Sequence, residues 1–110
     1  MKTLLVAIGA AFGAPTRHYI DMKFRSKYRF PLGIMLINIT GSFLIGLVAN
    51  SSQDKFAFWA IGFAGAFTTW STFALDIYLG IRMRDNLNTV LNFLLSLVLG
   101  FAALKLGMSL

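Results

Sequence analysis

Four long apolar stretches, separated by short polar interruptions, occupy most of this chain and leave no room for a soluble domain. The stretches lie at 3–20, 32–51, 56–81 and 87–108. An α-helix rises ~1.5 Å per residue, so a helix needs about 20 apolar residues to cross the hydrocarbon core of a bilayer. We therefore predict an all-α integral membrane protein, with one domain over 1–110 and four transmembrane helices.

The composition supports this class. Hydrophobic residues make up 57% of the chain and charged residues 13%, whereas soluble domains average about 25% charged residues. The first stretch imitates a secretory signal, but three more apolar stretches follow it, so we expect a first transmembrane helix instead. The chain has no cysteine and one histidine, which excludes disulfides and metal centres built from these side chains.

The basic residues lie between the apolar stretches, so the formal charge of +6 does not indicate nucleic-acid binding. Seven of the ten flank the first and third connections, and three lie on the opposite side: Arg17, Lys23, Arg25, Lys27, Arg29, Arg82 and Arg84 against Lys2, Lys55 and Lys105. The positive-inside rule places the basic connections in the cytoplasm. Both termini are then predicted outside.

Small, hydroxylated and aromatic residues crowd positions 62–73, inside the third stretch. Broken backbone at bilayer depth is tolerated only where its polar groups are buried in protein or line a wet cavity, so a break here indicates transport. Gly65 and Thr68 are candidate break points whose carbonyl oxygens suit a hard cation such as Na⁺. The alternative is that both are ordinary packing residues of a membrane helix.

Phe67, Trp70 and Phe73 recur every third residue, so we expect them on one side of the third helix. Aromatic rings have positive edges. Edges lining a narrow passage would hold a small anion weakly enough for conduction. An aromatic packing ridge has the same spacing and stays open as the alternative.

Polar side chains within the second and fourth stretches suggest a polar track. They are Asn38, Thr40, Ser42, Asn92 and Ser96. Alternatively, the hydroxyls bond the preceding turn and the amides tie helices together. Small residues four apart favour close helix packing, namely Gly9 and Gly13, Ser42 and Gly46, Gly62 and Ala66, Ser96 and Gly100, and Ala103 and Gly107.

The run GAFTTWSTF at 65–73 resembles the third-helix signature of the CrcB/Fluc fluoride channels. Shorter matches stand in the family's order: Gly13-Ala14 with Arg17, then Pro31-Leu32-Gly33 through Asn38 to Gly46, then Ser96 with Gly100. The resemblance covers almost the whole chain, with size and helix count in register.

The resemblance implies an antiparallel, dual-topology dimer of four-helix subunits with a broken third helix, in the plasma (inner) membrane of a prokaryote. Such a dimer is a channel, not an enzyme, and passively exports fluoride from the cytoplasm for fluoride resistance. The positions matching the family's fluoride pore are Asn38, Trp70, Phe73, Asn92 and Ser96. A structural Na⁺ at the dimer interface would bind backbone carbonyls of Gly65 and Thr68, and Arg17 matches a structural position.

Three pore-associated positions depart from the family pattern. Trp70, Ile34 and Asn92 stand where the family usually has phenylalanine, threonine and tyrosine. In an antiparallel homodimer one sequence must insert in both orientations, which favours equal loop charge on the two sides of the membrane. Here seven basic residues lie on one side and three on the other. We therefore slightly favour a heterodimer with a sister subunit over a homodimer.

A small multidrug resistance-type, proton-coupled antiporter is the alternative function, because it shares this length and helix count. Antiport of that kind needs a membrane-embedded carboxylate, usually in the first helix, and the stretch 3–20 has none. Asp76 is the only carboxylate within a predicted span. We expect it to pair with Arg17 or to cap a helix.

Overall fold

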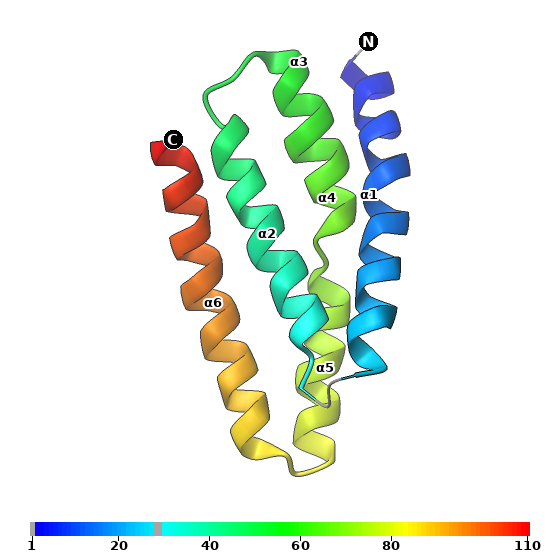
Figure 1. The fold of residues 1–110 in the computed structure, drawn as a ribbon, viewed down its shortest axis with the longest axis vertical. Helices are drawn as coiled ribbons and strands as arrows, with labels where there is room; N and C mark the ends of the chain where they lie inside the picture. The colour runs from blue at the N-terminus through cyan, green and yellow to red at the C-terminus, as the bar shows by residue number, and fades with distance from the viewer. Residues whose placement is uncertain (1, 28–29) are drawn as a thin grey trace.

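The computed structural model describes residues 2–27 and 30–110, and the secondary structure within them is entirely helical. Four long rods run antiparallel, with both termini at one end (Figure 1). Three of the rods are single helices, α1 (Lys2–Arg25), α2 (Leu32–Val48) and α6 (Asn86–Ser109). The third rod joins α3 (Gln53–Lys55), the wider π-helix η1 (Phe56–Ala64), α4 (Gly65–Phe67) and α5 (Trp70–Arg82). The predicted all-α fold with a broken third helix is present.

The first helix is longer than the apolar stretch suggests, because it runs past residue 20 to Arg25. Pro15 lies inside α1 without ending it, although proline lacks the N–H that an α-helix uses. An ion pair between Asp21 and Arg25, four residues apart, supports the last turn. The expectation of a first helix without an acidic residue therefore fails for α1 as observed, since α1 contains Asp21.

Glycines bring the backbones of two helix pairs together. α1 packs against η1, where a Cβ at Gly9 would collide with the carbonyl oxygen of Phe58. α2 packs against α6, where a Cβ at Gly107 would collide with the carbonyl oxygen of Phe43. These contacts use the small residues that the sequence places at four-residue spacing.

A small core lies beside the break, formed by Ile34, Ile37, Phe67 and Phe73. Among the described residues, α6 is the one helix long and apolar enough to cross a bilayer, with mean hydropathy 2.0. Only 11% of its most apolar window is buried inside the chain. The other expected spans differ because α2 has 17 residues, α1 carries charges toward its end and the third rod is interrupted.

Candidate functional site

The third rod breaks at two threonines. α4 ends at Phe67, Thr68 is extended with φ −76° and ψ 160°, and Thr69 is extended with φ −150° and ψ 125°. α5 then begins at Trp70, where the Thr69 hydroxyl accepts a hydrogen bond from the Thr72 amide at 3.2 Å. Threonine suits this position because its hydroxyl caps a free amide of the first turn. The break is thus followed by a new helix, α5, whose N-terminus Thr69 caps.

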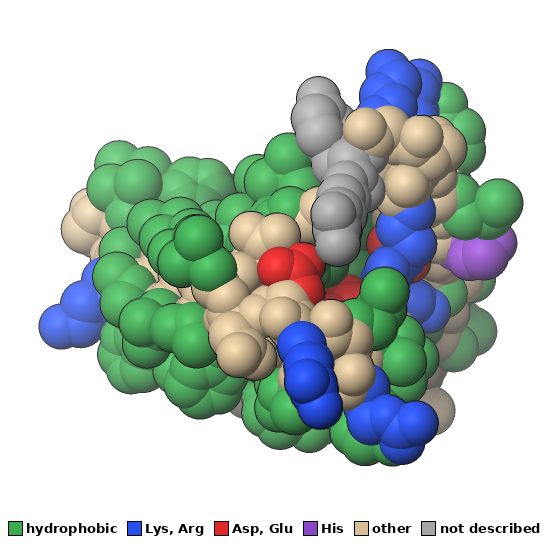
Figure 2. Space-filling view, turned by 90° about the horizontal axis from the view of Figure 1, so that it is seen from below, with side chains coloured by type: hydrophobic (Ala, Val, Ile, Leu, Met, Phe, Trp, Pro, Cys, Tyr) green, Lys and Arg blue, Asp and Glu red, His purple; other side chains and the backbone are tan. Residues whose placement is uncertain are grey.

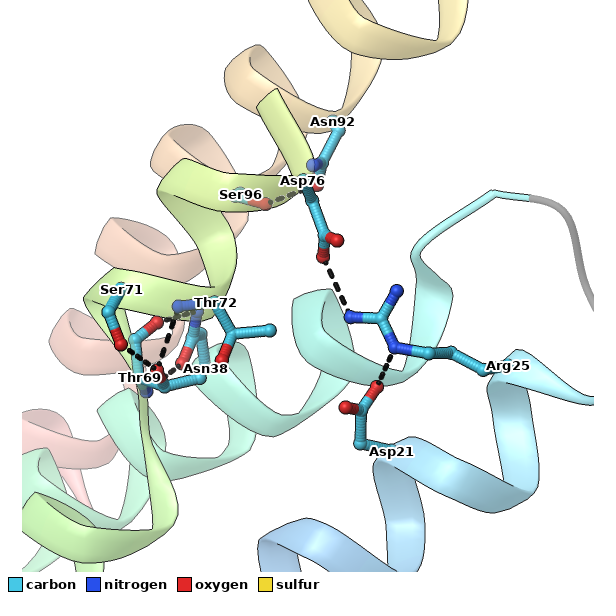
Figure 3. Close-up of polar contacts among 9 residues, drawn as sticks. All are labelled: Asp21, Arg25, Asn38, Thr69, Ser71, Thr72, Asp76, Asn92 and Ser96. Atoms are coloured by element: carbon cyan, nitrogen blue, oxygen red, sulfur yellow. Dashed lines mark hydrogen bonds and ion pairs between the residues drawn. The ribbon is translucent and has the colours of Figure 1, made fainter. Parts of the chain in front are cut away.

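Asn38 on α2 holds the break in place (Figure 3). Its Nδ2 donates to the Thr69 carbonyl at 3.1 Å, and its Oδ1 accepts from the Thr69 amide at 2.8 Å. One turn along α2, Gly41 leaves room for the break, since a Cβ there would collide with Cγ2 of Thr68. A single amide side chain therefore satisfies both backbone groups of the residue that leaves the helix.

The break removes the helical hydrogen-bond donors of the Gly65 and Thr68 carbonyls, which the sequence analysis predicts as cation ligands. In a continuous α-helix the Gly65 carbonyl would accept from the Thr69 amide, and the Thr68 carbonyl from the Thr72 amide. Those amides donate instead to Asn38 Oδ1 and to the Thr69 hydroxyl. The described residues contain no cluster of three His, Asp or Glu side chains, so a cation here would rely on such carbonyls. Both fit Na⁺, whose ligands are oxygens.

Arg17 on α1 also contacts this segment. Its Nε donates to the carbonyl of Ala66 in α4 at 3.3 Å. Arg17 therefore ties α1 to the end of the helix before the break. The expected pairing of Asp76 with Arg17 is wrong. Asp76, on α5, pairs instead with Arg25, which lies on α1 as Arg17 does.

The aromatic residues do not share one face. Phe67 and Phe73 are 5% exposed, whereas Trp70 is 73% exposed. Two extended threonines separate Phe67 from Trp70, yet Phe67 and Phe73 lie in the same core, and Trp70 is the exposed member of the three. Trp70 and Phe73 remain neighbours across 5.6 Å between ring centroids, and Phe73 stacks on Phe93 of α6 at 6.4 Å.

The polar residues of α6 form a pair within the fold. Asn92 is 2% exposed, and its Oδ1 accepts from the Ser96 hydroxyl at 3.1 Å. Ile34, which departs from the family pattern, is 1% exposed in the core. Its apolar side chain therefore packs rather than lining a polar surface.

Four of the predicted site residues border one of two cavities. Asn38, Thr68 and Trp70 border a hollow of about 230 Å³ at the break. Asn92 borders a second one of about 190 Å³ between α5 and α6. A third hollow of about 460 Å³ lies near the chain's N-terminal residues, and none of the predicted site residues borders it.

Sequence reasoning missed a charge cluster at the second hollow (Figure 3). Arg25 Nη2 donates to Asp76 Oδ2 at 3.1 Å. Arg25 Nε lies 2.8 Å from Asp21 Oδ1, close enough for an ion pair but out of line for a hydrogen bond. The four-residue spacing of Asp21 and Arg25 was an available signal, but only for a helix continuing past residue 20.

Comparison with known proteins gives a match along nearly the whole chain. Residues 4–108 match the family model described as CrcB-like protein, Camphor Resistance (CrcB). The chain is 38% identical to the "Fluoride-specific ion channel FluC" of Thermosipho melanesiensis, covering 98% of this chain and 94% of that protein. It is 40% identical to the "Fluoride-specific ion channel FluC 2" of Rhodococcus jostii, covering 97% and 96%. The similarity therefore extends well beyond the break.

Proposed function

The chain belongs to the CrcB family, and we propose that it is a fluoride-selective channel that passively exports fluoride from the cytoplasm. The observation that carries the proposal is the capped break, held by Asn38 and followed by Trp70 and Phe73, at the positions that match the family's third-helix signature. Fluoride-specific relatives cover nearly the full chain. Export would relieve the cell of the anion and give fluoride resistance.

The aromatic pair supplies the anion contact in this proposal. Trp70 and Phe73 meet at 48° between ring planes, so edges as well as faces are presented around them. Positive ring edges attract an anion without the strength of a full charge, which permits release. The amide of Asn38 and the Asn92–Ser96 pair would add polar contacts along the route.

The proposed channel is an antiparallel dimer in the plasma membrane of a prokaryote, in which the termini of this chain lie outside and those of its partner inside. Support comes from the apolar surface of α6, little of which is buried inside the chain, and from Trp70, which a single chain leaves 73% exposed. Large apolar surfaces of this kind need cover from lipid or a partner. A sister subunit remains slightly favoured over a second copy because of the charge bias.

The proposed structural Na⁺ lies at the dimer interface. The freed carbonyls of Gly65 and Thr68 would hold it, since their helical donors bond elsewhere. When bound, Na⁺ would supply a fixed positive charge beside these carbonyl oxygens. Arg17 would keep its structural role by fixing Ala66 beside this point.

The proposal is tested by reconstituting the purified chain into fluoride-loaded liposomes and recording efflux with a fluoride electrode. The chain is reconstituted alone and together with a candidate sister subunit, and chloride-loaded liposomes serve as the control. We expect fluoride efflux without chloride efflux, slow for the chain alone and faster with the partner. Equal release of both anions would overturn selectivity, and full fluoride efflux by the chain alone would overturn the obligate heterodimer.

Asp76→Asn separates the channel from the antiporter. Asp76 is ion-paired with Arg25, whereas proton-coupled antiport needs a membrane-embedded carboxylate that exchanges protons. We expect the variant to retain fluoride efflux within about threefold of wild type and wild type to show no proton-driven uptake of a cationic dye. Dye uptake by wild type that Asp76→Asn abolishes would instead establish antiport.

A further inference from the structure

Arg25 joins two carboxylates at the end of the molecule opposite the termini. Its guanidinium reaches Asp21 on its own helix at 2.8 Å and Asp76 on α5 at 3.1 Å. The side chains of Asp76 and Asp21 are 7% and 16% exposed, whereas that of Arg25 is 44% exposed. Figure 3 shows the Asp76 carboxylate pointing toward Arg25, across the space between α5 and α1.

The same carboxylate borders a cavity that several polar side chains line. The hollow of about 190 Å³ between α5 and α6 is lined by both Arg25 and Asp76, together with Asp85 and the amide of Asn92. Asp85 accepts a hydrogen bond from Asn88 at 3.1 Å. Seen from this end, recessed Asp side chains lie among Lys and Arg side chains (Figure 2). Asn92 is the most buried of these residues, with 2% of its surface exposed.

A carboxylate beside an anion route is unfavourable unless its charge is cancelled. Repulsion between like charges is much stronger in a partly buried, low-dielectric site than in water. Arg25 is the basic side chain within ion-pair distance of Asp76 among the described residues. The planar guanidinium forms ion pairs with Asp21 and Asp76 at once, whereas a lysine ammonium is a single point charge on a flexible stem.

We propose that Arg25 is a positioning residue for the anion route: it draws the Asp76 carboxylate toward α1 and cancels the charge that would otherwise repel fluoride from Asn92. Asp21 orients the guanidinium from one turn earlier on the same helix. The inference rests on the proposed channel function and adds a residue outside the aromatic and amide positions of the pore.

The main test compares fluoride efflux per reconstituted protein for Arg25→Gln and for the double variant Arg25→Gln with Asp76→Asn. We expect Arg25→Gln to lower efflux by about tenfold, because the carboxylate is left uncompensated. Removing that carboxylate in the double variant should restore efflux to within about threefold of wild type. Lys27→Gln, which removes an exposed cation from the same end, is the matched control and should behave as wild type.

A second variant tests charge independently of folding. The chain has no cysteine, so Arg25→Cys introduces a unique thiol at a partly exposed position. A cationic methanethiosulfonate should raise the efflux of this variant by about threefold, and an anionic one should not. If the side chain at position 25 served only to hold the helices together, neither reagent would change the fluoride efflux of Arg25→Cys.

The outcomes distinguish this inference from the channel function itself. Wild type without fluoride efflux, alone or with a partner, would overturn both. A conducting wild type would overturn the role of Arg25 alone if Arg25→Gln were equally fast. The same conclusion would follow if the double variant stayed as slow as Arg25→Gln, or if both reagents acted alike on Arg25→Cys.

Discussion

The side chain of Asn38 satisfies the backbone of Thr69 on both sides, through hydrogen bonds of 3.1 and 2.8 Å. Those bonds explain how an extended residue is accommodated inside a packed rod, where an unpaired amide or carbonyl is costly. They also decide which helix carbonyls lose their donors. One side-chain amide thus stabilises the break and also takes the amide donor that the Gly65 carbonyl would have in a continuous helix.

Asn38→Ala should therefore damage the break. We expect a loss of about 1–3 kcal/mol in the free energy of unfolding, because two backbone groups are left unpaired. Fluoride efflux should fall by about tenfold or more as Thr69 and Trp70 shift. Thermal unfolding in detergent and the electrode assay measure the two effects. Asn50→Ala, at an exposed turn, should change neither, and an Asn38→Ala variant as stable as wild type would contradict the prediction.

Two helix pairs are held at close range where a glycine on one helix faces the backbone of the other. At Gly107 an added Cβ would collide with the Phe43 carbonyl oxygen, and at Gly46 with that of Leu104. At Gly100 the nearest atom would be the Ser42 hydroxyl oxygen, 3.8 Å away. At the scale of elements, the α2–α6 contact is therefore tight near one end and looser along its middle.

Gly107→Ala should separate α2 from α6, whereas Gly100→Ala should be tolerated. We expect Gly107→Ala to cost about 1–3 kcal/mol in unfolding free energy, since backbone must move to admit the methyl group. Gly100→Ala should stay within about 0.5 kcal/mol of wild type. Unfolding in increasing mole fractions of denaturing detergent compares the pair. Equal stability of the two variants would show that the α2–α6 spacing adapts freely.

Several basic side chains gather at the end of the molecule opposite the termini. The ends of α1 and α5 carry Lys23, Arg25 and Arg82, and Figure 2 shows Lys and Arg side chains around this face. Arg29, counted with them from the sequence, lies outside the described residues. Because short loops with this bias are retained in the cytoplasm, the fold predicts one preferred orientation rather than two.

Reporter fusions at the C-terminus test that orientation. Alkaline phosphatase should be active and a cytoplasmic fluorescent reporter dark, by a margin of about tenfold, because the termini are expected outside. A variant with Lys27, Arg82 and Arg84 all changed to Gln should give both signals. Equal signals from the unaltered chain would indicate insertion both ways and favour the homodimer.

The helical class, the break within 62–73 and the family motifs were readable from sequence because hydropathy and local chemistry encode them directly. The different burial of Phe67, Trp70 and Phe73 was not, since it depends on how the segments on either side of the two extended threonines pack against the other helices. Nor was the partner of Asp76, because α1 runs on past Pro15 and brings Arg25 to it.

Hydropathy and motifs were enough to assign a helical CrcB-family protein whose third helix is interrupted. The packing of the helices was needed to show that Asn38 bonds the Thr69 amide and carbonyl, that Gly65 and Thr68 lose their helical donors, and that Arg25 pairs with two carboxylates. The difference lies in the range of the forces involved. Hydrophobicity and helix propensity act within a segment, whereas hydrogen bonds and ion pairs between helices depend on the phase and length at which each helix meets its neighbours.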